Sequence, residues 1–216
     1  MSTVAVVRNQ TVIAWLSGAG SAVRERAGYL TQLDAAIGDG DHGTNMTRGF
    51  DAVDKALAAQ PDMPPGRVLL VAGKTLVSTV GGASGPLWGS AFKAAGRRLG
   101  DSGGLDGEAL ADALDAALAA VMELGAAAPG DKTMVDALGP AAAALRERTA
   151  AGAPLADAVA AAADAAEEGA AATVPMQARK GRASYLGEPS IGHQDPGATS
   201  AALIVRALHA VVAGEA

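Results

Sequence analysis

Alanine is the residue that most constrains how this chain can fold. It supplies 54 of the 216 residues, half of the hydrophobic set, whereas only 3% of the residues are aromatic. Side chains this small fill little volume, so a core built from them must bring backbones close together. Alanine also has the highest helix propensity, whereas strands favour β-branched and aromatic side chains. The composition therefore favours helices packed against helices.

Periodic apolar positions predict eight helices, give or take one, and no segment alternates with the period of a strand. The first helix covers residues 9–37, where Gly18 and Gly20 are candidate points for a break. No linker divides the helices and no repeat relates them, so we expect one all-α bundle with residues 1–216 as a single domain. The other expected helices cover residues 46–59, 65–80, 86–99, 105–124, 133–149, 154–173 and 197–212.

Composition also excludes several classes of protein. The chain has no cysteine, which rules out disulfides, zinc–thiolate sites, iron–sulfur clusters and a cysteine nucleophile. Its net charge of −6 argues against nucleic-acid binding. The least charged stretch, residues 75–92, is broken by glycines and Pro86, so we expect no membrane span. Residues 1–10 carry no pattern of a secretory signal, and we therefore expect a cytoplasmic protein.

Three aspartates surround a glycine-rich turn after the first predicted helix. Asp34 stands near the helix end, and Asp39 and Asp41 lie in the turn. Carboxylates that meet repel one another unless a cation lies among them, and oxygen ligands favour Mg²⁺ or Ca²⁺ over zinc. An EF-hand fits poorly, because Thr44 stands where that loop requires glycine. The alternative is an Asx turn, in which the aspartates cap backbone amides.

The residues after this turn predict an anion site. His42, Gly43, Thr44 and Asn45 open the next helix, and amides at a helix N-terminus attract anions. Carboxylates beside such amides suit a polyphosphate that is bridged by a metal ion. We expect His42 to be a hydrogen-bonding member of this site rather than a catalytic base. The loop 81–85 also offers amides, although alone it is more typical of a tight turn.

Three later positions have two interpretations each. Asp131 is the expected N-cap of the helix that follows it, and Met134 belongs either to the core or against an adenine face. Arg182 stands in a basic run within a long irregular loop, which is either solvated or a partner for phosphate. Asp195 either caps the last helix or accepts a hydrogen bond from a ribose hydroxyl.

Taken together, four motifs resemble the dihydroxyacetone kinase L subunit family, DhaL. They occur in the order of the family and span nearly the whole chain. The resemblance implies an antiparallel eight-helix barrel that holds ADP or ATP and magnesium at one end. The motifs are Asp34 with Gly38-Asp39-Gly40-Asp41-His42-Gly43-Thr44-Asn45, Gly81-Gly82-Ala83-Ser84-Gly85-Pro86-Leu87, residues 130–138 and residues 181–197.

The resemblance also implies roles for single residues. Asp34, Asp39 and Asp41 match the carboxylates that hold a pair of Mg²⁺ ions on the diphosphate. No position matches a catalytic base, and Pro189 stands where a basic residue is common in the family. The positions that match nucleotide contacts are His42, Gly43, Thr44, Asn45, Ala83 and Ser84 near the phosphates, Gly125 and Met134 around the adenine, then Arg182, and finally Asp195, Pro196 and Gly197.

Partners follow from the same resemblance. In this family the K subunit carries dihydroxyacetone on a histidine, and a chain of 216 residues has no room for that part. We therefore expect a subunit that is inactive without K. It would relay a phosphoryl group from the M subunit, a phosphoprotein of the phosphotransferase system, through bound ADP and ATP to dihydroxyacetone.

Two alternatives to this relay stay open. One is an ATP-dependent subunit that acts beside a separate K subunit on dihydroxyacetone or a related hydroxyketone. The other is a nucleotide-sensing regulatory module that docks on a transcriptional regulator. A second copy of the chain, in a homodimer, is a further partner to consider.

Overall fold

A computed structural model describes residues 9–60, 62–101 and 105–214, so the start of the chain, where no secretory signal is expected, lies outside it. The described residues form α-helices, two short 3₁₀ helices (η1 and η2) and no strand, which confirms the all-α expectation. The elements are α1 (Asn9–Glu25), α2 (Ala27–Ile37), α3 (His42–Ala58), α4 (Pro65–Thr79), α5 (Ser84–Leu99), α6 (Gly107–Gly125), α7 (Val135–Ala150), α8 (Leu155–Ala172), η1 (Arg182–Leu186), η2 (Glu188–Ser190) and α9 (Pro196–Gly214).

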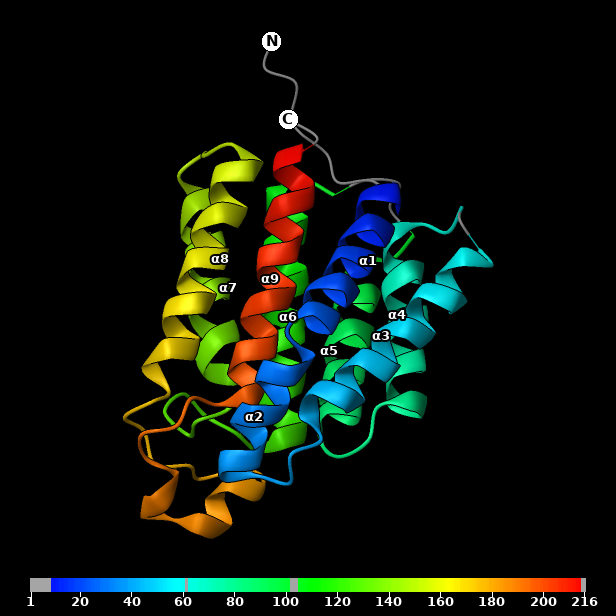
Figure 1. Cartoon of the computed structure of the whole chain (residues 1–216). Coiled ribbons are helices and arrows are strands. Elements are labelled where there is room, and N and C mark those ends of the chain that lie inside the picture. Colours follow the sequence, from blue (N-terminus) through cyan, green and yellow to red (C-terminus); the bar gives the residue numbers. More distant parts are fainter. Residues whose placement is uncertain (1–8, 61, 102–104, 215–216) are drawn as a thin grey trace.

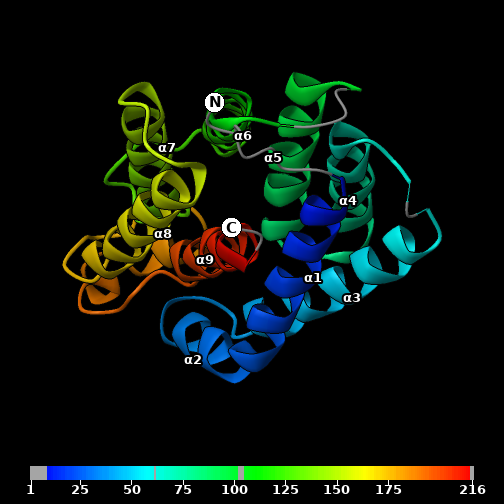
Figure 2. The same cartoon turned by 90° about the horizontal axis from the view of Figure 1, so that it is seen from above.

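Eight of the described α-helices form a closed ring (Figure 2). Around the ring, α1 contacts α3, each helix from α3 to α8 contacts the next one in the chain, and α9 contacts α1 again. The remaining helix, α2, follows α1 and packs outside the ring against α3 and α9. The arrangement confirms the expected eight-helix barrel, with α2 as an addition.

Neighbouring helices in the ring run in opposite directions (Figure 1). The loops that precede α3, α5, α7 and α9 therefore all lie at one end of the barrel, the lower end in Figure 1. The start of α1 and the ends of α3, α5, α7 and α9 lie at the other end. Because every second loop reaches the same end, the four motifs of the sequence meet there.

Two expected helix boundaries were wrong. The first helix breaks at Arg26, whose backbone leaves the helical region at φ −101° and ψ 7°, and not at Gly18 or Gly20. Those glycines stay helical and serve packing: a Cβ on Gly20 would lie 3.2 Å from the Cβ of Phe50 on α3. The next helix begins at His42, four residues before the expected start.

Glycines, which have no side chain, let α4 and α5 pack closely. Gly66 and Gly73 on α4 face Gly89 and Gly96 on α5. A Cβ on Gly73 would lie 2.8 Å from the carbonyl oxygen of Gly89, and one on Gly96 would lie 2.6 Å from that of Gly66. Backbone therefore packs directly on backbone, as the composition predicts for a core with few large side chains.

One described helix, α9, is long and apolar enough to cross a membrane by length and composition alone. In the structure, 56% of that stretch is buried inside the protein. Its contacts with α1, α7 and α8 account for this burial. The hydropathy of α9 is therefore that of a core helix.

We predict that Gly73→Ala lowers the free energy of unfolding by about 1–3 kcal/mol, as overpacked cores do. The clash with the Gly89 carbonyl outweighs the better helix propensity of alanine. Gly28→Ala on α2 is the matched control, because its Cβ meets nothing within 4 Å. Urea unfolding measures both variants, and a Gly73→Ala protein as stable as the wild type would contradict the account of this contact.

Candidate functional site

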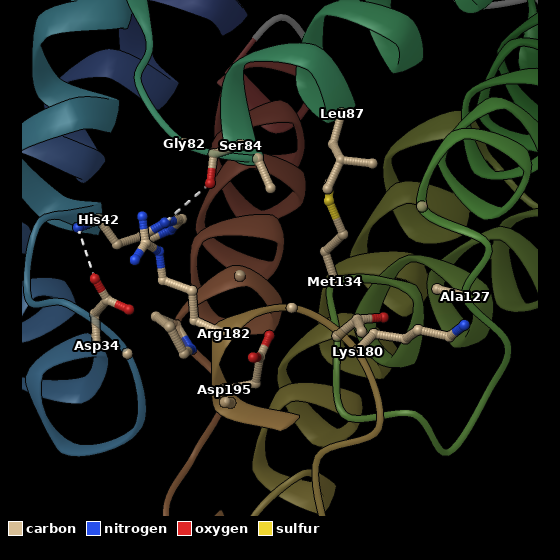
Figure 3. Close-up of a pocket in the computed structure, with 18 of the residues that line it drawn as sticks. Asp34, His42, Gly82, Ser84, Leu87, Ala127, Met134, Lys180, Arg182 and Asp195 are labelled. Carbon is tan, nitrogen blue, oxygen red and sulfur yellow. Dashed lines mark hydrogen bonds between the residues drawn. The ribbon is translucent and has the colours of Figure 1, made fainter. Parts of the chain in front are cut away.

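A cavity of about 410 Å³ opens where the four loops meet at one end of the barrel (Figure 3). Twelve of the fifteen residues that the sequence predicts for the site line it. The barrel thus brings together positions from all four motifs. The twelve are Asp34, Asp39, Asp41, His42, Ala83, Ser84, Gly125, Met134, Arg182, Asp195, Pro196 and Gly197.

The other three, Gly43, Thr44 and Asn45, lie in the first turn of α3 and do not line the cavity. Gly43 packs against α2, where a Cβ would come within 2.0 Å of the Ala27 carbonyl oxygen. Thr44 faces a shallow hollow elsewhere on the surface.

Asn45 supports the wall of the cavity from behind. Its Oδ1 accepts a hydrogen bond from Nη2 of Arg48 at 2.7 Å, and Nε of the same arginine donates to the Thr79 carbonyl at 2.8 Å. These bonds join α3 to the end of α4, just before the loop that carries Gly81 to Ala83. Asn45 is therefore placed to hold that loop.

Asp34, Asp39 and Asp41 come together as the sequence predicts. Each offers a carboxylate oxygen, and these three oxygens lie within 4.8 Å of one another. Asp34 is buried, and its Oδ2 accepts from the amides of Asp41 at 2.8 Å and His42 at 3.0 Å. Asp34 thus caps the start of α3, as the Asx-turn alternative requires. These two bonds use only Oδ2 of Asp34, so the other carboxylate oxygens of the cluster stay available. A set of oxygen ligands fits a hard divalent cation.

A positively charged side chain of the long loop, Arg182, faces the same carboxylates. Nη2 of Arg182 lies 3.1 Å from Oδ2 of Asp39, and both side chains are partly exposed at the mouth of the cavity. An exposed pair of this kind contributes little to stability. Arg182 can therefore exchange Asp39 for another anion at low cost.

His42 is held between two serines. Nε2 lies 3.0 Å from Oγ of Ser200, and Nδ1 lies 3.2 Å from Oγ of Ser84. Because Ser200 gives its proton to the Gly197 carbonyl, His42 must donate from Nε2 and accept at Nδ1. Burial lowers the pKa of His42, and this outweighs the negative charges of Asp34 and Asp41, which raise it. The lowered pKa favours this neutral form.

The opposite half of the cavity is apolar. Met134 is 5% exposed, and its side chain points toward Leu87 (Figure 3). Gly125 ends α6 in the same wall, and a Cβ there would lie 3.4 Å from Leu87. The cavity therefore has a carboxylate and arginine end and an apolar end, which suits a ligand with an anionic part and a flat apolar part.

The long loop before α9 is ordered by hydrogen bonds within it and by one to the loop before α7. Buried Ser190 accepts from the Ala178 amide at 2.9 Å and donates to the Gly187 carbonyl at 2.6 Å. The Arg179 amide donates to the Asp131 carbonyl at 3.0 Å. Two 3₁₀ helices, η1 and η2, occupy a segment that the sequence predicts as irregular, and they place Arg182 at the cavity.

Asp131 is not the N-cap of α7, so that expectation was wrong. Its Oδ2 accepts from the Ala128 amide at 2.8 Å, within the loop. Asp136 instead holds the loop before the helix, by accepting from the amides of Gly130 at 2.5 Å and Thr133 at 2.8 Å. The first amide of α7, that of Val135, donates to Oγ1 of Thr133 at 3.2 Å. The helix begins at Val135, so a carboxylate inside its first turn reaches back to the loop.

Sequence reasoning missed Lys132, which lines the cavity although it is only 1% exposed. Its Nζ donates to the carbonyls of Thr173, at 2.7 Å, and His193. Burial lowers its pKa, and the charge of Asp195 opposes that shift. Burial also raises the pKa of Asp195 to about 7. A lysine in a loop is ordinary in sequence, so no signal marked this buried position.

Comparisons with known proteins place the chain in a family. Residues 36–210 match the DAK2 domain family. The ADP-binding subunit DhaL of the PEP-dependent dihydroxyacetone kinase from Escherichia coli is 45% identical over 197 residues, which cover 91% of this chain and 94% of that protein. The L-erythrulose 1-kinase of Mycolicibacterium smegmatis is 41% identical, over 83% of this chain and 31% of that protein.

Solved structures give the same relationship. The native dihydroxyacetone kinase of C. freundii superposes with a TM-score of 0.72 at 27% identity, over 97% of this chain. Its complex with AMP-PNP and Mg²⁺ gives a TM-score of 0.69 at 29% identity, over 92% of this chain. This chain spans 36% and 33% of those two chains. With its fold, its cavity and its near full-length match to DhaL, the chain belongs to the DAK2 domain family, among the dihydroxyacetone kinase L subunits.

Proposed function

We propose that this chain is the nucleotide-binding subunit of a cytoplasmic dihydroxyacetone kinase, and that residues 1–216 act as one nucleotide-binding domain. One observation carries the proposal: the cavity joins the three-carboxylate cluster of Asp34, Asp39 and Asp41 to an apolar end around Met134. ADP or ATP with Mg²⁺ has the matching combination of an anionic, metal-bound part and an aromatic part.

Relatives of nearly the same extent support this proposal. The subunits from E. coli and Listeria innocua, at 45% and 42% identity, both bear names that describe ADP-binding subunits of PEP-dependent dihydroxyacetone kinases. This chain covers 94% and 93% of them. The C. freundii kinase, which shares the fold, was solved with AMP-PNP and Mg²⁺.

At the anionic end, Asp34, Asp39 and Asp41 would hold a pair of Mg²⁺ ions. When bound, these ions neutralise phosphate charge and orient the phosphoryl group for in-line transfer. Asp34 is already fixed by two amides of α3, so one ligand is preorganised. Arg182 would turn from Asp39 to a phosphate oxygen, because a metal-bound carboxylate no longer needs its charge.

The remaining residues would shape the rest of the pocket. Neutral His42 fixes Ser84, and the loop residue Ala83, which lines the cavity, would offer its backbone amide to the phosphates. Gly43, Thr44 and Asn45 lie in the first turn of α3 and do not line the pocket, and of these Asn45 supports the wall through Arg48. Met134 and Gly125 would enclose the adenine, and the segment Asp195, Pro196 and Gly197 would close the site.

Two partner proteins would complete the reaction. A phosphoprotein of the phosphotransferase system, the M subunit, supplies the phosphoryl group to ADP held here, and the K subunit presents dihydroxyacetone to receive it. The residues of this chain bind, orient and neutralise. Removal of the proton from the substrate hydroxyl falls to K, so this chain alone would be inactive.

A related substrate is the second candidate. Two kinases of M. smegmatis, 41% and 44% identical to this chain, are named for L-erythrulose and D-erythrulose. This chain spans only 31% of each of these kinases. A kinase for another hydroxyketone, with ATP as the donor, is therefore compatible with the same nucleotide site.

We predict that the purified protein releases ADP or ATP when it is denatured.

We also predict that Asp39→Asn or Asp41→Asn weakens Mg²⁺-dependent ADP binding at least about tenfold, the factor that corresponds to 1.4 kcal/mol. Each change removes one charged metal ligand. Asp62→Asn, in the exposed loop at the far end of the barrel, is the control and should bind as the wild type does. Titration calorimetry gives the affinities, and binding that is unchanged in both site variants would refute the metal site.

A reconstituted assay tests the donor. With K, M and the general phosphotransferase proteins, phosphoenolpyruvate should support dihydroxyacetone phosphorylation, whereas added ATP without M should support only a single transfer. Sustained turnover on ATP and K alone would instead favour the ATP-dependent alternative. Nucleotide binding without turnover in either mixture would favour a regulatory module.

A further inference from the structure

A buried lysine, Lys132, stabilises the side of the cavity that is formed by Asp195, Pro196 and Gly197. Lys132 stands in the loop between α6 and α7, and its Nζ donates to carbonyls of two other segments. One is Thr173, which directly follows α8, and the other is His193, two residues before Asp195. One ammonium group therefore ties the loop before α7 to both ends of the long loop before α9, and residues of both loops line the cavity.

The backbone of Lys132 is itself unusual. Its φ is +62°, in the left-handed region that residues with a side chain rarely adopt. Such conformations persist where the surroundings impose them, and they gather at functional sites. Here the surroundings are the two carbonyls, which a side chain from this position reaches.

Thr173 connects this lysine to Asp195. Its carbonyl accepts from Lys132, while its Oγ1 accepts from the Asp195 amide at 2.9 Å. Oδ2 of Asp195 then accepts from the Ala198 amide at 2.7 Å. No described residue donates to the other carboxylate oxygen, and Asp195 lines the cavity. That oxygen is a free acceptor at the cavity wall.

The position of Asp195 identifies the group it meets. In Figure 3 it lies between Arg182, at the anionic end, and Met134, at the apolar end. A nucleotide that spans these ends places its ribose between them. The hydroxyl groups of a ribose are hydrogen-bond donors, which a carboxylate oxygen accepts.

We propose that Lys132 is a positioning residue, which holds Asp195 so that its free carboxylate oxygen accepts a hydrogen bond from a ribose hydroxyl of the bound nucleotide. The inference rests on the proposed function and adds how the site distinguishes a ribonucleotide. It assigns a role to the lysine that neither its exposure nor its sequence context suggests.

Charge supports the same role. Burial raises the pKa of Asp195 to about 7, and the nearby carboxylates of Asp136 and Asp34 act in the same direction. Lys132 and the Ala198 amide oppose this rise. The ammonium group therefore favours the ionised carboxylate, which is the stronger acceptor.

The test compares ADP with 2′,3′-dideoxy-ADP, which lacks both ribose hydroxyls, on protein freed of nucleotide and supplied with Mg²⁺. The wild type should prefer ADP by about tenfold, as expected for a hydrogen bond to a charged group. Lys132→Met should reduce that preference to near unity. Lys74→Met, an exposed lysine on α4, is the matched control and should keep it.

The ratio separates positioning from mere support of the fold, because a destabilised protein would bind both nucleotides less well in proportion. If Lys132→Met does not fold, Lys132→Gln keeps a donor group, the side-chain amide, without the charge and should show a reduced preference. A wild-type ratio in either folded variant would overturn the inference. A wild type that binds neither nucleotide would instead refute the proposed function.

Discussion

Close contact between helix backbones is the constraint on which the rest of this structure depends. Gly73 and Gly89 let α4 and α5 meet with carbonyl oxygens where side chains would otherwise stand. Alanine fills much of the remaining core. Close packing keeps eight antiparallel helices in one ring, and an antiparallel ring sends every second loop to the same end. The site is a consequence of that topology, because four loops that are far apart in sequence become neighbours in space.

Within the site, charge is balanced by a few fixed groups. Asp34 is held by amides at the start of α3, and His42 is kept neutral between Ser84 and Ser200. On the closing side, Lys132 and Asp195 place opposite charges in a buried environment without touching, joined through Thr173. The exposed pair of Arg182 and Asp39 is the exception, and its weakness leaves the arginine free to exchange partners.

Much of the fold could be predicted from the sequence, because helical periodicity is local, and most of the site residues could be predicted from the motifs that resemble the DhaL family. The carboxylate cluster follows from aspartates spaced around a glycine-rich turn, and twelve predicted residues line the cavity. The orientation of Thr44 could not be predicted, since it depends on where α3 begins. The break at Arg26 depends on tertiary packing, and so does the position of Asp131, which bonds within its own loop and does not cap α7. The role of Lys132 could not be predicted, because its partners are backbone carbonyls, which every residue has.

The central claim is that the four loops at one end of the barrel act as a single site for a nucleotide with magnesium. Amide chemical shifts, recorded as ADP and Mg²⁺ are added together, test this most directly. The account predicts changes in all four loops, around residues 38–42, 81–84, 125–134 and 180–197, and little change at residues 151–154 on the opposite end. Changes confined to one loop, or centred on the opposite end, would contradict it.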